Sequence, residues 1–86
     1  MQFERIDVEC LPGERIREYP ASFVFRGQHY RVQEIIDRWY EGGDRPGRPW
    51  VDYYRVKTDQ GRTCILRYTS LFDAWSILVS ADLSLF

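Results

Sequence analysis

The residues best suited to covalent or metal chemistry are few and scattered in this 86-residue sequence. It holds one histidine, His29, and two cysteines, Cys10 and Cys64, which lie in no CxxC or Cys/His cluster. A zinc site needs about four nitrogen or sulfur ligands, which the chain cannot supply locally. The two cysteines could form a disulfide, but their spacing does not indicate one. We therefore expect no metal, no cofactor and two half-buried free thiols.

A spaced acidic series is the other candidate for catalysis, formed by Glu34, Asp37, Glu41 and Asp44. These carboxylates could bind a metal or transfer protons only if several met in one pocket. We expect them to diverge into solvent along a curved strand. His29 has no evident partner nearby, although a triad can draw residues from anywhere in a fold. Because so short a chain rarely builds a deep pocket, we expect the protein not to be an enzyme.

Arginine and aromatic residues interleave in the middle of the chain, as in "RPW" (48–50) and "YYR" (53–55). Curled sheets bind single-stranded nucleic acid by stacking bases on aromatic rings and contacting phosphates with arginine. The candidate nucleic-acid-binding residues are Arg31, Tyr53, Arg55, Lys57 and Arg67. The alternative is that the rings fill a small core and the arginines solvate its rim. The net charge of −1 argues against tight nonspecific binding.

The sequence finishes on an apolar segment, "DLSLF", where a chain end is usually polar. An extended segment of this kind can lay alternate apolar side chains into a partner's groove. The candidate partner-binding residues are Asp82, Leu83, Ser84, Leu85 and Phe86. The alternative is a last strand that packs on the domain, because Leu and Phe are ordinarily core residues.

Short alternating runs predict the elements that must position these residues. Within "FVFRGQHYRV", Gly27 suits a tight hairpin turn, and Gly61 suits a second hairpin. Residues 34–40 have the spacing of either a helix or a bulged strand, and we favour a curved strand running to about Trp39. The prolines and charges of 11–22 predict a loop. Strands are expected over 3–10, 23–36 as a hairpin, 50–58, 62–70 and 72–79.

These five or six short strands predict an all-β fold, a small curled antiparallel sheet or partly open barrel with little or no helix. We expect a single β-domain over 1–80 and a C-terminal tail over 81–86. Strand alternation places Tyr54 and Val56 in the core, and Tyr53, Arg55 and Lys57 outside.

The composition is that of an ordinary globular domain, with 44% hydrophobic and 29% charged residues. The start, "MQFERIDVEC", carries charges where the apolar part of a signal peptide would lie. No apolar run approaches the roughly 20 residues of a membrane span. We therefore expect a cytoplasmic protein without membrane partners.

Residues 22–79 resemble a small bacterial family of unknown function. The resemblance rests on "FVFRG" (23–27), "YRV" (30–32), Trp39, "YYRVKTD" (53–59) and Trp75. Domains of that family stand alone or are similar to the C-terminal end of mutagenesis proteins that resemble Y-family polymerases. The present chain has a shorter central loop than the longer members. The family has no assigned activity, so the resemblance implies a DNA-repair setting and no mechanism.

The segment 82–86 resembles the peptide by which bacterial polymerases and repair proteins hold the DNA sliding clamp. That pattern is Gln, Leu, Ser or Asp, Leu, Phe, and only Asp82 departs from it. A carboxylate accepts hydrogen bonds but does not donate them, so the first contact should weaken. The resemblance implies a non-enzymatic adaptor in DNA repair or translesion synthesis. Its partners would be the clamp, a polymerase-like repair protein or single-stranded DNA. The alternatives are a single-strand nucleic-acid-binding domain with a structural tail, or a general protein-interaction domain.

Overall fold

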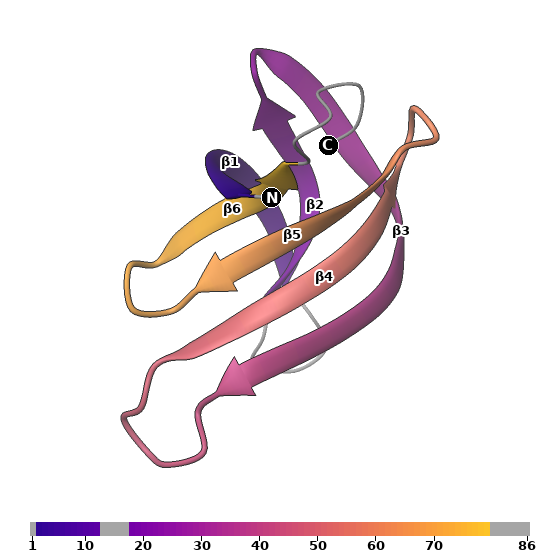
Figure 1. Ribbon diagram of the computed structural model, residues 1–86. Helices are drawn as coiled ribbons and strands as arrows, with labels where there is room; N and C mark the ends of the chain where they lie inside the picture. The colour runs from indigo at the N-terminus through magenta and orange to yellow at the C-terminus, as the bar shows by residue number, and fades with distance from the viewer. Residues whose placement is uncertain (1, 13–17, 80–86) are drawn as a thin grey trace.

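A computed structural model describes residues 2–12 and 18–79, which form six antiparallel strands and, within those ranges, no helix (Figure 1). The strands are β1 (Gln2–Pro12), β2 (Glu18–Phe25), β3 (Gln28–Gly42), β4 (Trp50–Thr58), β5 (Thr63–Thr69) and β6 (Ala74–Val79). Each pairs with the next along the chain. The all-β prediction is confirmed. The tail 81–86, with the candidate clamp-binding residues Asp82–Phe86, lies outside the described residues.

The sheet closes into a barrel because β1 pairs with β6 as well as with β2. Residues 2–6 of β1 align with residues 75–79 of β6, from Gln2 opposite Val79 to Ile6 opposite Trp75. The other edge of β6 pairs with β5. Both edges of the last described strand therefore carry a neighbour.

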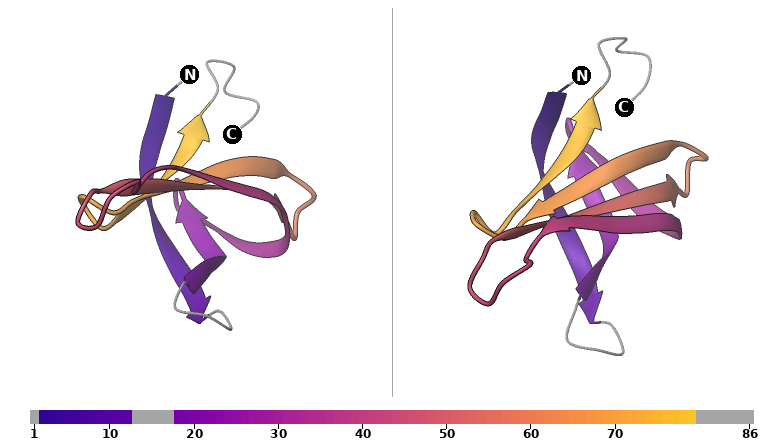
Figure 2. Two further views of the ribbon diagram at one scale, coloured as in Figure 1. Left: turned by 90° about the horizontal axis from the view of Figure 1, so that it is seen from below. Right: turned by 60° about the horizontal axis from the view of Figure 1, so that its bottom comes forward.

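The barrel is bent, so that other strands lie on both sides of the sheet formed by β3, β4 and β5 (Figure 2). In the left view of Figure 2, the start of β1 and the end of β6 rise on one side of the sheet formed by β3, β4 and β5. The strand β2 lies on the other side of that sheet. One face of β3–β5 therefore meets the barrel core, and the opposite face meets the start of β1.

Two tight hairpins form where glycine was expected to allow them. Arg26 and Gly27 link β2 to β3 with φ values of 50° and 80°, as a two-residue hairpin turn of type I′ requires. Gly61, with φ of 80°, lies in the connection between β4 and β5. Positive φ is disfavoured for residues with a Cβ atom, so these glycines help to fix the register of both hairpins.

The core consists of inward side chains from all six strands. On β4, Tyr54 and Val56 are buried, which confirms the predicted alternation. Leu66 and Ile77 face them from β5 and β6 with no exposed surface. The two cysteines form no disulfide with each other; Cys10 is half-buried as expected, whereas Cys64 is fully buried. Burial raises the pKa of the Cys64 thiol to about 12, which keeps it protonated.

The ambiguous stretch 34–40 is a strand, as favoured, and β3 continues beyond Trp39 to Gly42. Its register with β4 shifts twice, between Val32 and Glu34 and between Ile35 and Asp37. An extra residue at each bulge changes which side chains share a face. These bulges explain why the apolar spacing also resembled a helix.

The prediction of a loop over 11–22 is wrong at both ends, because β1 continues to Pro12 and β2 begins at Glu18. Proline is tolerated in a sheet beside a bulge or at an unpaired edge. Pro20 lies at both: the β1–β2 register shifts next to it, and β3 pairs with β2 only as far as Ser22. The prolines that predicted a loop over 11–22 therefore belong to irregular strands.

Candidate functional site

Four of the five predicted nucleic-acid-binding residues lie on the outer face of β4 and β5. Tyr53, Arg55 and Lys57 alternate with the buried residues of β4. Arg67 lies on β5 directly opposite Tyr53. The structure therefore brings an aromatic ring and a guanidinium together on neighbouring strands, with two more cations farther along β4.

The fifth residue, Arg31, lies on a different surface. It lies on β3 opposite Ser22 of β2. Its backbone N–H donates to Asp59 Oδ1 over 3.2 Å, and its carbonyl accepts the N–H of Asp59 over 2.9 Å. The exposed Arg31 side chain lines a cleft between β2 and β3. The five predicted residues thus do not form one site.

An outer-face cluster of Phe3, Trp39, Tyr53 and Arg67 surrounds the Tyr53–Arg67 pair. The rings of Trp39 and Tyr53 stack at 5.3 Å with 7° between their planes. Phe3 lies 6.4 Å from Tyr53, centroid to centroid, and the Arg67 guanidinium carbon is 3.7 Å from the Phe3 centroid. All four side chains are half-buried. Phe3 reaches the cluster because the start of β1 rises over this face (Figure 2).

The cations of this outer face differ in whether an acidic residue stands opposite them. Asp37 and Glu34 of β3 stand opposite Arg55 and Lys57, respectively. In the part of the chain that the structure describes, the buried Arg67 Nε has no hydrogen-bond partner. A buried donor without a partner costs about 1–3 kcal/mol. Arg67 differs from the other two cations, because the residues opposite it are Tyr53 and Ser76 and neither is acidic.

A second polar cluster surrounds the buried carboxylate of Asp52 on β4. That carboxylate accepts a hydrogen bond from Trp50 Nε1 over 3.0 Å and lies 3.7 Å from an Arg38 guanidinium nitrogen. Nearby, the Tyr68 hydroxyl donates to Asp73 Oδ1 over 2.6 Å. This hydrogen bond, with desolvation, raises the pKa of Tyr68 to about 12. Because these groups bind one another, we assign this cluster a structural role.

The acidic series does not converge. Glu34, Asp37, Glu41 and Asp44 are all exposed and follow β3 into the next loop, and His29 is exposed on the same strand. Within residues 2–12 and 18–79, no three His, Cys, Asp or Glu side chains group closely enough to hold a metal ion. The same ranges contain no helix with the length and apolarity of a membrane span.

Comparison with known proteins adds no relative. No protein-family model matches the chain, and neither a curated protein nor a solved structure matches it.

Sequence reasoning missed Phe3 and gave Trp39 no partner. Trp39 lies in the Arg/aromatic stretch "RWY" (38–40), which was a usable signal. No local pattern marked Phe3, because its contact with Arg67 depends on closure between β1 and β6.

Proposed function

We propose that the protein is a non-enzymatic, cytoplasmic adaptor in DNA repair or translesion synthesis. It holds the bacterial sliding clamp through Asp82–Phe86, and its barrel contributes a second contact, for example to a polymerase-like repair protein. The match of "DLSLF" to the clamp-binding pattern at all positions but the first supports this function. So does the resemblance of residues 22–79 to the ends of mutagenesis proteins.

The closure of the barrel is the structural observation that carries the proposal. If Leu83–Phe86 formed a further strand paired with β6, β6 would need an edge without a neighbour. Yet β6 pairs with β5 on one edge and with β1 on the other. Over Trp75–Ile77, both edges of β6 are therefore occupied and a further strand could not pair there, which favours the use of the segment as a peptide.

The expected affinity is modest. Full burial of Leu83, Leu85 and Phe86 would contribute about 1.5–3 kcal/mol for each side chain. Ordering the segment and losing translational freedom offset part of this gain. The result is a reversible tether, which suits partners that exchange on one clamp.

Titration against a purified bacterial sliding clamp tests the proposal. The double variant Leu85→Ala/Phe86→Ala should bind about 100-fold more weakly, because it removes two apolar anchors. Its melting temperature should equal that of the intact protein. Asp82→Gln, which restores the usual first residue, should bind more tightly than the natural sequence.

A matched control exists in the connection between β5 and β6. Leu71 and Phe72 are 65% and 74% exposed, so Leu71→Ala/Phe72→Ala removes a similar apolar pair elsewhere. This control should bind the clamp like the intact protein. Failure of the intact protein to bind, together with a lower melting temperature for Leu85→Ala/Phe86→Ala, would refute the proposal and favour a structural segment.

Binding of single-stranded nucleic acid is a second candidate function, favoured by the outer-face cluster. Tyr53 and Arg67 stand in register there, and Arg67 Nε is buried without a partner in the described structure. A base could stack on the exposed part of the aromatic rings in this cluster while a phosphate contacts Arg67. Arg55 and Lys57 would add contacts along the same strand.

Fluorescence polarisation with a labelled oligothymidine of about 20 nucleotides, at several salt concentrations, tests this candidate. Each neutralised phosphate contributes about 0.7 to the slope of log K against log salt for single strands. Arg55→Ala/Lys57→Ala should therefore reduce the slope by about 1.4. Arg31→Ala, on the other surface, should leave it unchanged. An unchanged slope in the double variant, or the same loss in Arg31→Ala, would exclude this face as the site.

A further inference from the structure

The strands β2 and β3 pair over only four residues each and then diverge. Ser22–Phe25 align with Gln28–Arg31, and the pairing ends at Ser22 and Arg31. Before Ser22, β2 pairs only with β1, and after Arg31, β3 pairs only with β4. No described strand covers the two edges that face each other across this gap. Such edges present backbone N–H and C=O groups that another extended chain can bind.

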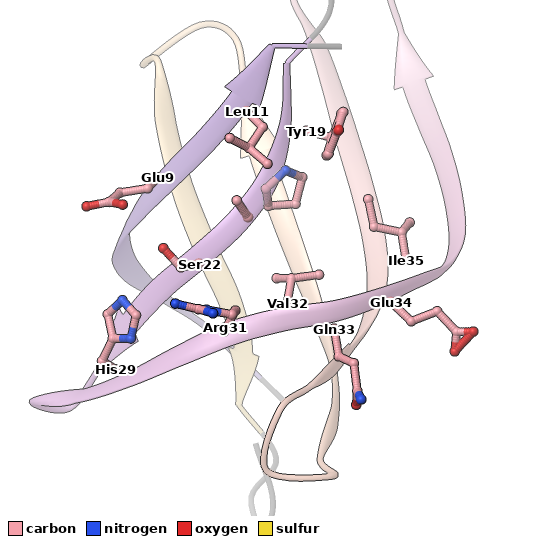
Figure 3. A pocket seen from close by; sticks show the side chains of 12 residues that line it. Glu9, Leu11, Tyr19, Ser22, His29, Arg31, Val32, Gln33, Glu34 and Ile35 are labelled. Atoms are coloured by element: carbon pink, nitrogen blue, oxygen red, sulfur yellow. The ribbon is translucent and has the colours of Figure 1, made fainter. Parts of the chain in front are cut away.

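The gap is a cleft of about 710 Å³, which we call the β2–β3 cleft. Figure 3 shows Leu11, Tyr19, Val32 and Ile35 projecting into it from its two sides. Leu11 is 52% exposed, Tyr19 38% and Ile35 36%. Large apolar side chains gathered around one hollow, and still exposed, mark a binding groove more often than isolated exposed residues do.

The first β3 bulge directs Ile35 into this cleft. In a regular strand, Val32 and Glu34 would share one face. The register shift after Val32 instead places Ile35 opposite the buried Val56, whereas Glu34 stands opposite the exposed Lys57. Figure 3 accordingly shows Ile35 inside the cleft and Glu34 pointing away from it. Bulges commonly re-aim side chains beside functional sites.

Among the described residues that line the cleft, Arg31 is the one that carries a full positive charge. It stands beside Ser22, at the end where the two strands separate. The described residues provide no ion pair for its guanidinium within 4.0 Å. Glu9 and Glu34 also line the cleft, and Figure 3 shows their carboxylates at its outer rim, where neither forms an ion pair with Arg31. An acidic group entering at this end would meet a cation that is not already paired.

We propose that the β2–β3 cleft binds an extended peptide segment of a partner protein. The segment carries apolar side chains at alternating positions and an acidic residue at the end beside Arg31. Its backbone adds to the open edge of β3, as peptides add to exposed strands in other recognition domains. The edge of β2 is less suitable, because Pro20 has no N–H to donate.

The bare strand edge, the four large apolar side chains and the two glutamates in the lining favour a peptide over nucleic acid, which would need several cations along its backbone. The residues named for this site differ from Asp82–Phe86, so variants of the cleft and variants of that segment test the two proposals separately. The cleft would supply the second contact that the proposed adaptor function requires.

Selection from a display library of random peptides about nine residues long, with the full-length protein as bait, tests this site. Enriched peptides are synthesised with a fluorescent label, and their affinities are measured by polarisation. They should alternate apolar and polar residues and carry an acidic residue at one end. Ile35→Lys should weaken their binding about tenfold or more, because it places a charge among the apolar anchors. Arg31→Ala should weaken acidic peptides about tenfold and leave versions with the acid replaced by alanine unchanged.

Leu71→Lys is the matched control, since Leu71 is 65% exposed in the β5–β6 connection, away from the cleft. It should bind the selected peptides like the intact protein, as should Leu85→Ala/Phe86→Ala. Should Ile35→Lys fail to fold, Leu11→Ser tests the opposite wall with little risk to the core. A library that yields no enriched peptide, or peptides that bind the folded cleft variants as well as the intact protein, would overturn the proposal without bearing on clamp binding.

Discussion

Replacement of Leu66 with alanine will lower the free energy of unfolding by about 3–4 kcal/mol. Leu66 has no exposed surface and stands between Tyr54 of β4 and Ile77 of β6, both of which are buried. The variant loses the burial of the removed atoms and gains the cost of the cavity that they leave. A closed barrel cannot easily shrink around that cavity, because paired strands hold its circumference.

The loss is large for a domain of this size. Stabilities of about 0.05–0.15 kcal/mol per residue imply about 4–13 kcal/mol for the whole chain. Leu66→Ala should therefore bring the protein close to its unfolding threshold at ordinary temperatures. Urea denaturation followed by tryptophan fluorescence measures the change.

Leu71→Ala removes the same atoms from a side chain that is 65% exposed, and it should change the stability by less than about 0.5 kcal/mol. Equal effects of the two leucine substitutions would show that Leu66 is not packed in the core as described.

The sequence predicted the local features of the fold because short-range physics determines them. The alternation along 50–58 placed Tyr54 and Val56 inside, and burial confirms both. Gly27 and Gly61 marked the two tight hairpins, and both have positive φ. These features depend on neighbouring residues and on the conformational freedom of glycine, so a single sequence contains enough information to find them.

Features that depend on contacts between residues far apart in the chain could not be predicted from the sequence. The pairing of β1 with β6 joins the two ends of the described chain, and no local pattern encodes its register. The bulges of β3 add single residues that break the period of two on which strand predictions depend. The strand over 18–22 was missed because proline normally excludes a strand, and its tolerance depends on a divergence from β3 that only the whole barrel creates.

The candidate sites show the same difference between local and distant contacts. Tyr53, Arg55, Lys57 and Arg67 share a face because β4 and β5 are hairpin neighbours, which the sequence could anticipate. Arg31 was grouped with them by composition alone, and the structure places it at the β2–β3 cleft. The cleft escaped notice because it arises where two strands stop pairing.

The outer-face cluster and the β2–β3 cleft are separate surfaces. The outer-face cluster lies where the start of β1 rises over one side of β3–β5, and β2 lies on the other side (Figure 2). A ligand at Tyr53 and Arg67 would therefore leave the cleft beside Arg31 accessible.

Replacement of Asp52 with alanine should lower the free energy of unfolding by about 3 kcal/mol. Asp52 is only 5% exposed, accepts the Trp50 Nε1 hydrogen bond and lies 3.7 Å from Arg38. Its removal leaves the indole donor without this acceptor and the guanidinium without its closest carboxylate. Arg38 is partly exposed, so water recovers some of its charge solvation and the loss stays below that of a fully buried pair.

Urea denaturation of Asp52→Ala, Arg38→Ala and the double variant separates the ion pair from the indole hydrogen bond. If Arg38 acts mainly through Asp52, the double variant should lose less stability than the sum of the single variants, by about 0.5–1 kcal/mol. Asp44→Ala, on an exposed loop residue, should change the stability by less than about 0.5 kcal/mol. Strict additivity would mean that Arg38 stabilises the barrel through its packing on the Tyr54 ring, 5.0 Å away, and not through Asp52. A loss for Asp52→Ala no larger than that for Asp44→Ala would remove the structural role assigned to this carboxylate, and Asp52 would then join the candidates for function.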